Sequence, residues 1–266
     1  MNSTTADSKI VMRIGQGALS VAALDASSHI LDYAVHNMKS GISTAANLRE
    51  AFNNVSLLSR TYARADVMLS SPTMLIPYDE FHEEEAATLY DHTFSGYDRS
   101  AKICSRMSDL SAVAVCSVEK DVQTVIADHF ENVRLLPVCL PVWQHLHQQG
   151  HEQTRQRLYA YFHDSMMDVF CFSQHRLKFC NAFHTTQAQD ALYFLLYAFS
   201  QLGLKGERDA ISVIGSMPQK KWLIERLRTY VVEVAAPEAK DTGLPEMLRW
   251  PSVPYDMQVF INQSSR

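Results

Sequence analysis

The sequence lacks an excess of positive charge. It carries 24 Lys and Arg residues against 29 Asp and Glu residues, a formal net charge of −5, and its pI is about 6.1. Proteins that bind nucleic acids usually present a basic surface to the phosphate backbone. The charge balance therefore gives no reason to expect nucleic-acid binding.

The N-terminal residues also lack a targeting signal of the usual kind. The segment MNSTTADSKIVMRIG contains no basic flank followed by a long apolar run, so it indicates neither a secretory signal nor a membrane anchor. We therefore expect a cytoplasmic protein without membrane insertion. A hydrophobic content of 47% is enough to form a full core in a chain of 266 residues.

Five cysteines lack the paired spacing of a metal site, and an odd number does not fit a complete disulfide framework. Four of them lie in apolar or alternating runs. We interpret them as reduced core thiols. They are Cys104, Cys116, Cys139, Cys171 and Cys180.

The clearest local pattern lies in the second half of the chain. Apolar residues alternate with more polar ones over Leu177 to Phe183, which predicts a strand. Thr186 and Gln189 have the spacing of a capping box for a helix over Gln187 to Leu202. Because apolar and aromatic residues surround most of that helix, we expect it to be a covered core helix.

The same order of elements is predicted in both halves: three strands, a helix, a strand, a helix and a strand. The first half has strands at Ile10–Ile14, Ala18–Leu24, His29–Asn37, Ala65–Leu69 and Thr73–Pro77, with helices at Thr44–Tyr62 and Asp79–Tyr90. Strands at Val113–Val118 and Val133–Leu136 and a helix at Val122–Phe130 extend it.

The second half repeats this order after a short polar region. Its strands are predicted at Arg157–Phe162, Met166–Phe172, Leu177–Phe183, Ala210–Ile214 and Tyr230–Val234, with helices at Gln187–Leu202 and Pro218–Arg228. The tail from Ala235 is rich in proline and is predicted to be an extended segment on the surface. The domains expected are residues 1–152 and residues 153–266, the latter including the tail.

A duplicated three-strand meander with alternating helices and strands resembles the actin-like ATPase superfamily, a ribonuclease H-like fold that includes sugar kinases, heat-shock chaperones and relatives of pilus-assembly ATPases. More specifically, the chain is similar to an uncharacterised bacterial family of unknown function with this fold. The resemblance covers roughly residues 10–234 and implies an α/β fold with two halves and mixed sheets, but no particular activity. It rests on Pro77, Phe81, Asn181, Phe183, Asp190, Tyr193 and Gly215.

The resemblance also shows what this chain has lost. Actin-like ATPases hold the phosphates of a nucleotide in two hairpin turns that contain glycine and an acidic residue. Here the first turn has Gly15 and Gly17 but no acid, and the second has Asp164 and Asp168 but no glycine. The turn expected to lie near the adenosine of a nucleotide contains a single glycine, Gly215. A retained site for ATP with Mg²⁺ would use these five residues, but the losses in both turns favour a protein without a cofactor.

Other polar clusters have ordinary structural interpretations beside the functional ones. His163 with Asp164 and Asp168 is either an acid–base and Mg²⁺ cluster or a polar turn. The run Asp79–Glu85 is either a site for a basic partner or a solvated helix start. The basic residues around Trp222 suggest a stripe for nucleic acid, but Glu225 interrupts it. Cys180 and His184 lie about 13 Å apart by strand rise, which is too far for the histidine to activate the thiol directly. The histidines at positions 145, 147 and 151 are interpreted as surface residues.

These observations favour a non-catalytic protein-interaction or assembly protein whose partner is another protein. No residue is assigned a catalytic role or a role as a metal ligand. The alternatives are a divergent ATP-binding protein or ATPase and, with less support, a translation-linked RNA-binding accessory.

Overall fold

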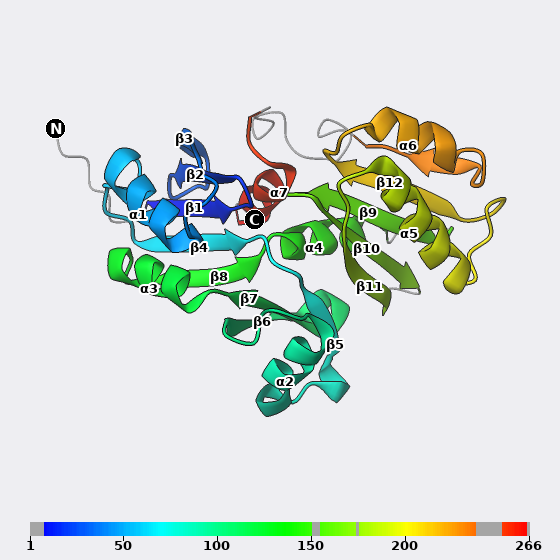
Figure 1. Ribbon diagram of the computed structural model, residues 1–266, viewed down its shortest axis with the longest axis horizontal. Helices are drawn as coiled ribbons and strands as arrows, with labels where there is room; N and C mark the ends of the chain where they lie inside the picture. The colour runs from blue at the N-terminus through cyan, green and yellow to red at the C-terminus, as the bar shows by residue number, and fades with distance from the viewer. Residues whose placement is uncertain (1–7, 151–154, 174–175, 238–251, 265–266) are drawn as a thin grey trace. The chain divides into compact units, whose positions relative to one another are not determined.

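The structure is a computed structural model that describes residues 8–150, 155–173, 176–237 and 252–264 (Figure 1). The chain forms two compact units. Of the described residues, the first unit contains 8–106, 113–142 and 252–264, and the second contains 107–112 and those from 143 to 237. The described C-terminal residues, 252–264, therefore belong to the first unit.

The first unit is built on a five-stranded sheet with the order β3-β2-β1-β4-β8. The hairpin strands are antiparallel, whereas β4 is parallel to β1 and β8 is parallel to β4. The predicted meander is confirmed, and the strand bounds agree with the sequence pattern to within a residue. They are β1 (Lys9–Ile14), β2 (Ala18–Leu24), β3 (Ile30–Asn37), β4 (Arg64–Leu69) and β8 (Val133–Pro137).

Helices α1 (Thr44–Asn54) and α3 (Lys120–His129) cover one face of this sheet. The Ser43 hydroxyl caps α1 by accepting a hydrogen bond from the Ala46 amide at 3.2 Å. The helix ends earlier than the predicted Tyr62 because Val55 already has an extended backbone. Leu48 of α1 and Val125 of α3 pack on the inward residues of the strands, such as Met12.

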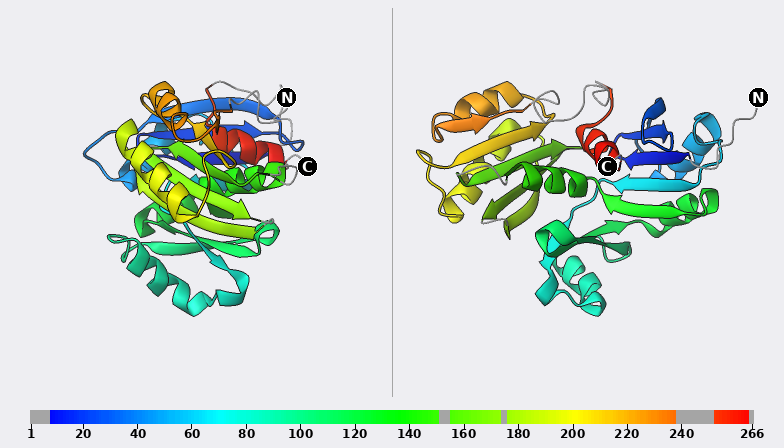
Figure 2. Two further views of the ribbon diagram at one scale, coloured as in Figure 1. Left: turned by 90° about the vertical axis from the view of Figure 1, so that its right-hand side faces the viewer. Right: turned by 180° about the vertical axis from the view of Figure 1, so that it is seen from behind.

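The opposite face is covered by α7 (Tyr255–Ser264), which lies beside β1 and β2 in Figures 1 and 2. This part of the tail is therefore a buried helix, and the prediction of an extended tail is wrong for it. Asp256 is fully buried, and both its carboxylate oxygens accept hydrogen bonds from Nε of Arg13, at 2.8 and 2.9 Å. The alternation that turns Met12 toward one face turns Arg13 toward the other.

A small three-stranded sheet, ordered β5-β7-β6, is inserted between β4 and α3. Ile76, Tyr90 and Val115 form the centre of its core. The sequence indicated β5, β7 and a helix here but missed β6, and it did not separate the insertion from the repeated elements. The elements are β5 (Met74–Pro77), η1 (Tyr78–Glu80), α2 (Glu83–Thr93), β6 (Ala101–Met107), η2 (Ser108–Leu110) and β7 (Ala112–Val118).

The second unit repeats the topology of the first, with a five-stranded sheet ordered β11-β10-β9-β12-β13. Its strands are β9 (Arg157–His163), β10 (Met166–Ser173), β11 (Arg176–His184), β12 (Ala210–Gly215) and β13 (Glu233–Ala235). Two helices, α5 (Ala188–Gln201) and α6 (Lys220–Leu227), pack on one face. A further helix, α4 (Cys139–Gly150), was not predicted; its later part belongs to this unit.

Helix α5 is less covered than its composition indicated. Ala191, Leu195 and Phe199 face the sheet and are buried, but Tyr193 is 64% exposed and Tyr197 is 54% exposed. The predicted capping box does not form, because the N-cap residue is Gln187 and its side chain makes no capping hydrogen bond. The expectation of a helix covered on most sides is therefore wrong, and α5 is an amphipathic helix with an aromatic outer face.

Candidate functional site

The first predicted phosphate turn joins β1 to β2. The Gly15 amide donates to the Ala18 carbonyl at 3.0 Å, and the Gly17 carbonyl accepts from the Met38 amide at 3.0 Å. Neither glycine has a positive φ, whereas Gly41, Gly96, Gly203 and Gly215 do. Backbone hydrogen bonds to neighbouring strand residues therefore hold this turn, and its conformation does not depend on a glycine with positive φ.

The second predicted turn joins β9 to β10 through only two residues, since His163 pairs with Met166. Asp164 has a φ of 45° and Ser165 a φ of 62°. Positive φ at both central residues is the conformation of a type I′ turn, which Asn and Gly usually occupy. The Ser165 carbonyl accepts a hydrogen bond from the Thr185 amide at 2.9 Å, so the backbone of this turn is tied to the end of β11.

The acidic residues of this turn are engaged by a histidine. His163 Nε2 lies 2.8 Å from Oδ2 of Asp168, and His163 Nδ1 lies 3.4 Å from Oδ2 of Asp164. The side chains of His163, Asp164 and Asp168 are only 5–14% exposed. The structure therefore brings the predicted cluster together, with both carboxylates directed at one imidazole ring.

Gly215 ends β12 in the second unit with a φ of 82°. A Cβ atom there would lie 2.1 Å from the carbonyl oxygen of Phe162, so no other residue fits without moving the backbone. The Gly215 carbonyl accepts a hydrogen bond from Nζ of Lys220 at 2.8 Å. The close approach of β12 to β9 therefore explains why this position is a glycine, and no bound ligand is needed to explain it.

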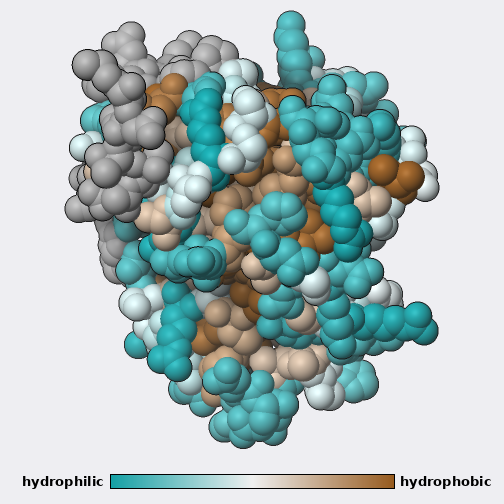
Figure 3. Space-filling view, turned by 90° about the vertical axis from the view of Figure 1, so that its left-hand side faces the viewer, coloured by the Kyte–Doolittle hydropathy of each residue, from teal (hydrophilic) through white to brown (hydrophobic). Residues whose placement is uncertain are grey.

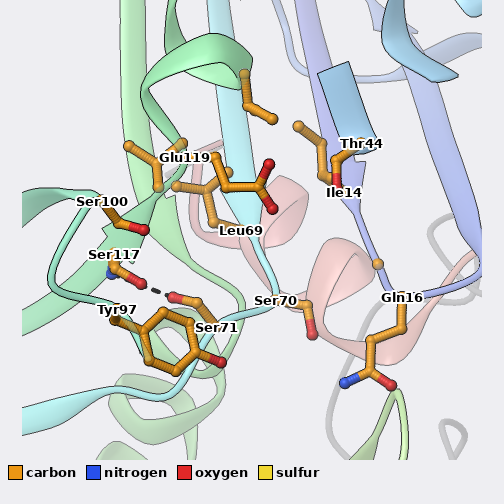
Figure 4. A pocket seen from close by; sticks show the side chains of 13 residues that line it. Ile14, Gln16, Thr44, Leu69, Ser70, Ser71, Tyr97, Ser100, Ser117 and Glu119 are labelled. Atoms are coloured by element: carbon orange, nitrogen blue, oxygen red, sulfur yellow. Dashed lines mark hydrogen bonds between the residues drawn. The ribbon is translucent and has the colours of Figure 1, made fainter. Parts of the chain in front are cut away.

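The first unit contains a polar pocket of about 300 Å³ beside the β1–β2 turn (Figure 4). It is bordered by Gly15 and Gln16 of the turn, by Ser70 at the end of β4 and by the start of α3. Side-chain hydroxyl groups make up much of its wall; they belong to Thr44, Ser70, Ser71, Tyr97, Ser100 and Ser117. Of the predicted nucleotide residues, Gly15 lines this pocket and Gly17 does not, whereas Asp164, Asp168 and Gly215 belong to the second unit.

Hydrogen bonds hold the wall of the pocket in place. The Ser117 amide donates to the Ser71 hydroxyl at 3.2 Å, and the Tyr90 hydroxyl donates to the Pro72 carbonyl at 2.7 Å. Burial raises the pKa of Tyr97, and the nearby Glu119 carboxylate raises it further. The Tyr97 hydroxyl is therefore a proton donor at neutral pH.

No local sequence pattern predicted this pocket. Its residues come from segments that are far apart in the sequence, and β6 and the insertion were not recognised as a separate sheet. One signal was present: Ser70 and Ser117 each stand at the carboxyl end of a buried strand, which is where ligands bind in α/β sheets.

The histidines of α4 are not surface residues. His145 and His147 of α4 are 9% and 4% exposed, so the interpretation as surface residues is wrong for both. The ring of His147 packs edge-on against Phe172, with the ring centres 5.0 Å apart. His151 lies outside the described residues. No group of three or more His, Cys, Asp or Glu residues is placed to share a metal ion in the part of the chain that the structure describes.

The cysteines are free thiols, and three of them, Cys116, Cys139 and Cys171, are buried. Burial raises the pKa of Cys116 to about 12 and that of Cys171 to about 11. It also raises the pKa of Cys180 well above the ordinary value, which makes this thiol a poor nucleophile. Cys104 is exposed on β6, so the expectation of a core position is wrong for this residue.

The charged runs have structural roles. Glu83, Glu84 and Glu85 form the first turn of α2, as the helix-start interpretation predicted, and all three are exposed. In α6, Leu223 and Leu227 are fully buried, and the guanidinium of Arg226 lies 5.8 Å from the centre of the Trp222 ring.

No helix among the described residues is long and apolar enough to cross a membrane.

Large apolar side chains are exposed on both units. On the face drawn in Figure 3, hydrophobic residues gather between hydrophilic ones. In the first unit, Leu31 and Val35 of the edge strand β3 are 63% and 50% exposed. In the second unit, the rings of Tyr193 and Tyr197 on α5 are stacked at an angle of 11°, with their centres 6.1 Å apart.

A family model described as a protein of unknown function, DUF3822, matches residues 1–234. The chain belongs to the DUF3822 family. The match covers both sheets and stops before α7, so the family assignment rests on the duplicated part of the fold.

Solved structures place this DUF3822 chain in a known fold. A Bacteroides thetaiotaomicron VPI-5482 protein, described as having an actin-like ATPase fold and unknown function, is 21% identical, with a TM-score of 0.86 over 97% of this chain and 96% of that one. The PilM–PilN type IV pilus biogenesis complex contains a chain that is 12% identical, with a TM-score of 0.62 over 98% and 99% of the two chains. A search of curated proteins gave no match. The fold is therefore the actin-like ATPase fold, as the resemblance implied.

Proposed function

We propose that this DUF3822 chain is a non-catalytic protein-interaction protein that works without a nucleotide. The observation that carries the proposal is the arrangement of the second hairpin turn. A carboxylate that orients Mg²⁺ and its water must keep oxygen atoms available for them. Here Oδ2 of Asp168 on β10 and Oδ2 of Asp164 in the two-residue turn are both directed at His163, at 2.8 and 3.4 Å.

The first turn supports the same proposal. It presents Gln16 rather than an acid, and the pocket beside it contains the carboxylate of Glu119. A carboxylate repels the phosphate groups of a nucleotide. Neither turn therefore offers the combination of glycine amides and an available acid that nucleotide hydrolysis needs.

A protein partner is supported by the outer face of α5. Tyr193 and Tyr197 project from one helix face with their rings stacked and more than half exposed, and tyrosine is enriched in protein interfaces because it combines a large apolar ring with a hydroxyl group. The structural relative PilM is found in a complex with PilN, which is an example of the same fold with a protein partner.

The nucleotide part of the proposal is tested by thermal unfolding with Mg-ATP, with Mg-ADP and without ligand. We expect no saturable stabilisation, because a ligand that binds only the native state raises the unfolding temperature with its concentration. Saturable stabilisation that is lost in Asp164→Ala or Gly15→Val would contradict the proposal and favour the alternative, ATP with Mg²⁺ at the five predicted residues. Salt-dependent retention of RNA would instead favour the RNA-binding alternative.

The interaction part is tested by quantitative affinity purification from the native host. We expect Tyr193→Ser combined with Tyr197→Ser to lose a stoichiometric partner that the unmodified protein retains. The matched control is Tyr78→Ser, which removes an exposed tyrosine from the first unit. Equal recovery of every partner with the double variant and with the control would refute a docking role for α5.

A further inference from the structure

The pocket of the first unit has a chemical character that the proposed function does not use. Its volume, about 300 Å³, is at the lower end of the range for small-molecule sites. Hydroxyl groups dominate its polar lining, and Ile14, Leu69 and Val122 give it an apolar wall. Figure 4 shows the Glu119 side chain reaching into the space between the β1–β2 turn and the insertion.

One buried hydroxyl group of the pocket, that of Ser70, has no hydrogen-bond partner among the described residues. Such a group loses the hydrogen bonds that it would make in water, at a cost of roughly 1–3 kcal/mol. The Ser70 amide, in contrast, donates to the Ile14 carbonyl at 3.0 Å, so the backbone is fixed and only the side chain is left for a ligand.

The start of α3 provides further hydrogen-bonding capacity. Glu119 is the N-cap residue, but its side chain makes no capping hydrogen bond. The amides of the first turn are therefore not satisfied by the cap, and the carboxylate remains available to accept hydrogen bonds. The pocket thus combines donors at a helix start and on Tyr97 with acceptors at Glu119 and Ser70.

The charge of the lining selects between classes of ligand. Glu119 is the one charged residue among the described residues that line the pocket, and no Lys or Arg accompanies it. Its carboxylate opposes a phosphate or another anion. The positive end of the α3 dipole partly compensates the Glu119 charge, so a cation gains little there.

We propose that this pocket binds an uncharged, polyhydroxylated small molecule of the size of a monosaccharide or a cyclic polyol. Neighbouring hydroxyl groups of such a ligand donate to the two carboxylate oxygens of Glu119, which is a strong, charge-assisted arrangement. A further ligand hydroxyl pairs with Oγ of Ser70. This activity goes beyond protein binding, and it does not require a nucleotide.

The test is a thermal-shift and calorimetric titration of the full chain with glucose, mannose, galactose, ribose and myo-inositol, each beside its phosphorylated form. We expect saturable binding of at least one uncharged compound and at least about tenfold weaker binding of its phosphate. Failure of all the uncharged compounds to bind overturns the proposal, and so does tighter binding of a phosphorylated form.

Two variants connect the binding to the pocket. Ser70→Ala should weaken binding about tenfold, the effect of one lost hydrogen bond to a well-matched ligand, without lowering the stability of the ligand-free protein. Glu119→Gln should weaken binding of the uncharged compound and also reduce its preference over the phosphate. The matched controls are Ser105→Ala on β6 and Glu131→Gln after α3, neither of which lines the pocket. Binding that is unchanged in both pocket variants overturns the assignment.

Discussion

Asp209 shows how a single buried carboxylate can organise a loop. It is 1% exposed, and it accepts hydrogen bonds from the Lys205 amide at 2.8 Å and from Nε of Arg208 at 3.0 Å. The Arg208 guanidinium is the main cause that lowers the pKa of Asp209 below the ordinary value of 3.8. The ionised form is therefore favoured in the folded protein and fixes the loop that leads from α5 into β12.

Replacement of this carboxylate should have a pH-dependent effect. We expect Asp209→Asn to destabilise the second unit by about 1–3 kcal/mol at pH 7, because hydrogen bonds to a charged group are lost. A group whose pKa is lowered by folding contributes stability above its unfolded value, and this contribution disappears as the pH falls through the folded value. The difference between the two proteins should thus be constant above about pH 5 and shrink below pH 3.8.

The measurement is urea unfolding at several pH values, followed by tryptophan fluorescence, since Trp143 and Trp222 both belong to the second unit. Glu207→Gln is the control because Glu207 is an exposed acid in the same loop. A difference that stays the same down to pH 2 would contradict the role of the ionised carboxylate.

At the scale of the element, α7 is held by a charge pair that no local sequence pattern indicates. Arg13 and Asp256 are separated by 243 residues, and both are buried, with side-chain exposures of 8% and 0%. Loss of one partner from a buried ion pair leaves the other charge without compensation and typically costs 3–5 kcal/mol.

We therefore expect Asp256→Ala to destabilise the first unit by about 3–5 kcal/mol, whereas Arg13→Met combined with Asp256→Leu recovers most of that loss, because an apolar pair needs no compensation. Chemical denaturation of Arg13→Met, of Asp256→Leu and of the double variant forms a double-mutant cycle that isolates the pair. If the double variant were as unstable as Asp256→Ala, shape rather than charge would account for the contribution of Asp256.

Elements with a strong local pattern were predictable. The strands β1, β2, β9 and β10 alternate or consist of apolar runs, and their bounds follow from the sequence. Helix α7 was missed because it follows a segment rich in proline and because Asp256, Gln258 and Asn262 occupy buried positions. Burial of such polar residues depends on partners from distant segments, which a local pattern does not reveal.

The candidate site was predictable only where its residues are close together in the sequence. His163, Asp164 and Asp168 are close in the sequence, so their clustering around one hairpin could be foreseen. The direction of both carboxylates toward His163 depends on the two-residue turn with positive φ. An Asp–Ser sequence does not predict such a turn. The pocket of the first unit depends on the insertion, whose edge strand β6 carries a mixed polar sequence, AKICSRM.

At the scale of the whole molecule, each of the two units has a hydrophobic core of its own. One core gathers residues such as Met12, Leu48 and Val67, and the other gathers residues such as Val169, Leu195 and Val213. Domains with separate cores can open separately, because stability is distributed in cooperative units. The charge pair of α7 provides a way to perturb one core while the other is left intact.

We expect Asp256→Ala to raise amide hydrogen exchange in β1, β2 and α7 by at least about a hundredfold, because a loss of about 3 kcal/mol corresponds to that factor. Exchange in β9, β10 and α5 should stay within about twofold of the unmodified protein. The measurement is exchange followed by mass spectrometry under native conditions, and Asp209→Asn is the reciprocal variant that should affect only the second set of peptides. If either variant accelerated exchange in both sets equally, the two units would unfold as one cooperative body, and ligand binding in the first unit would then stabilise the second as well.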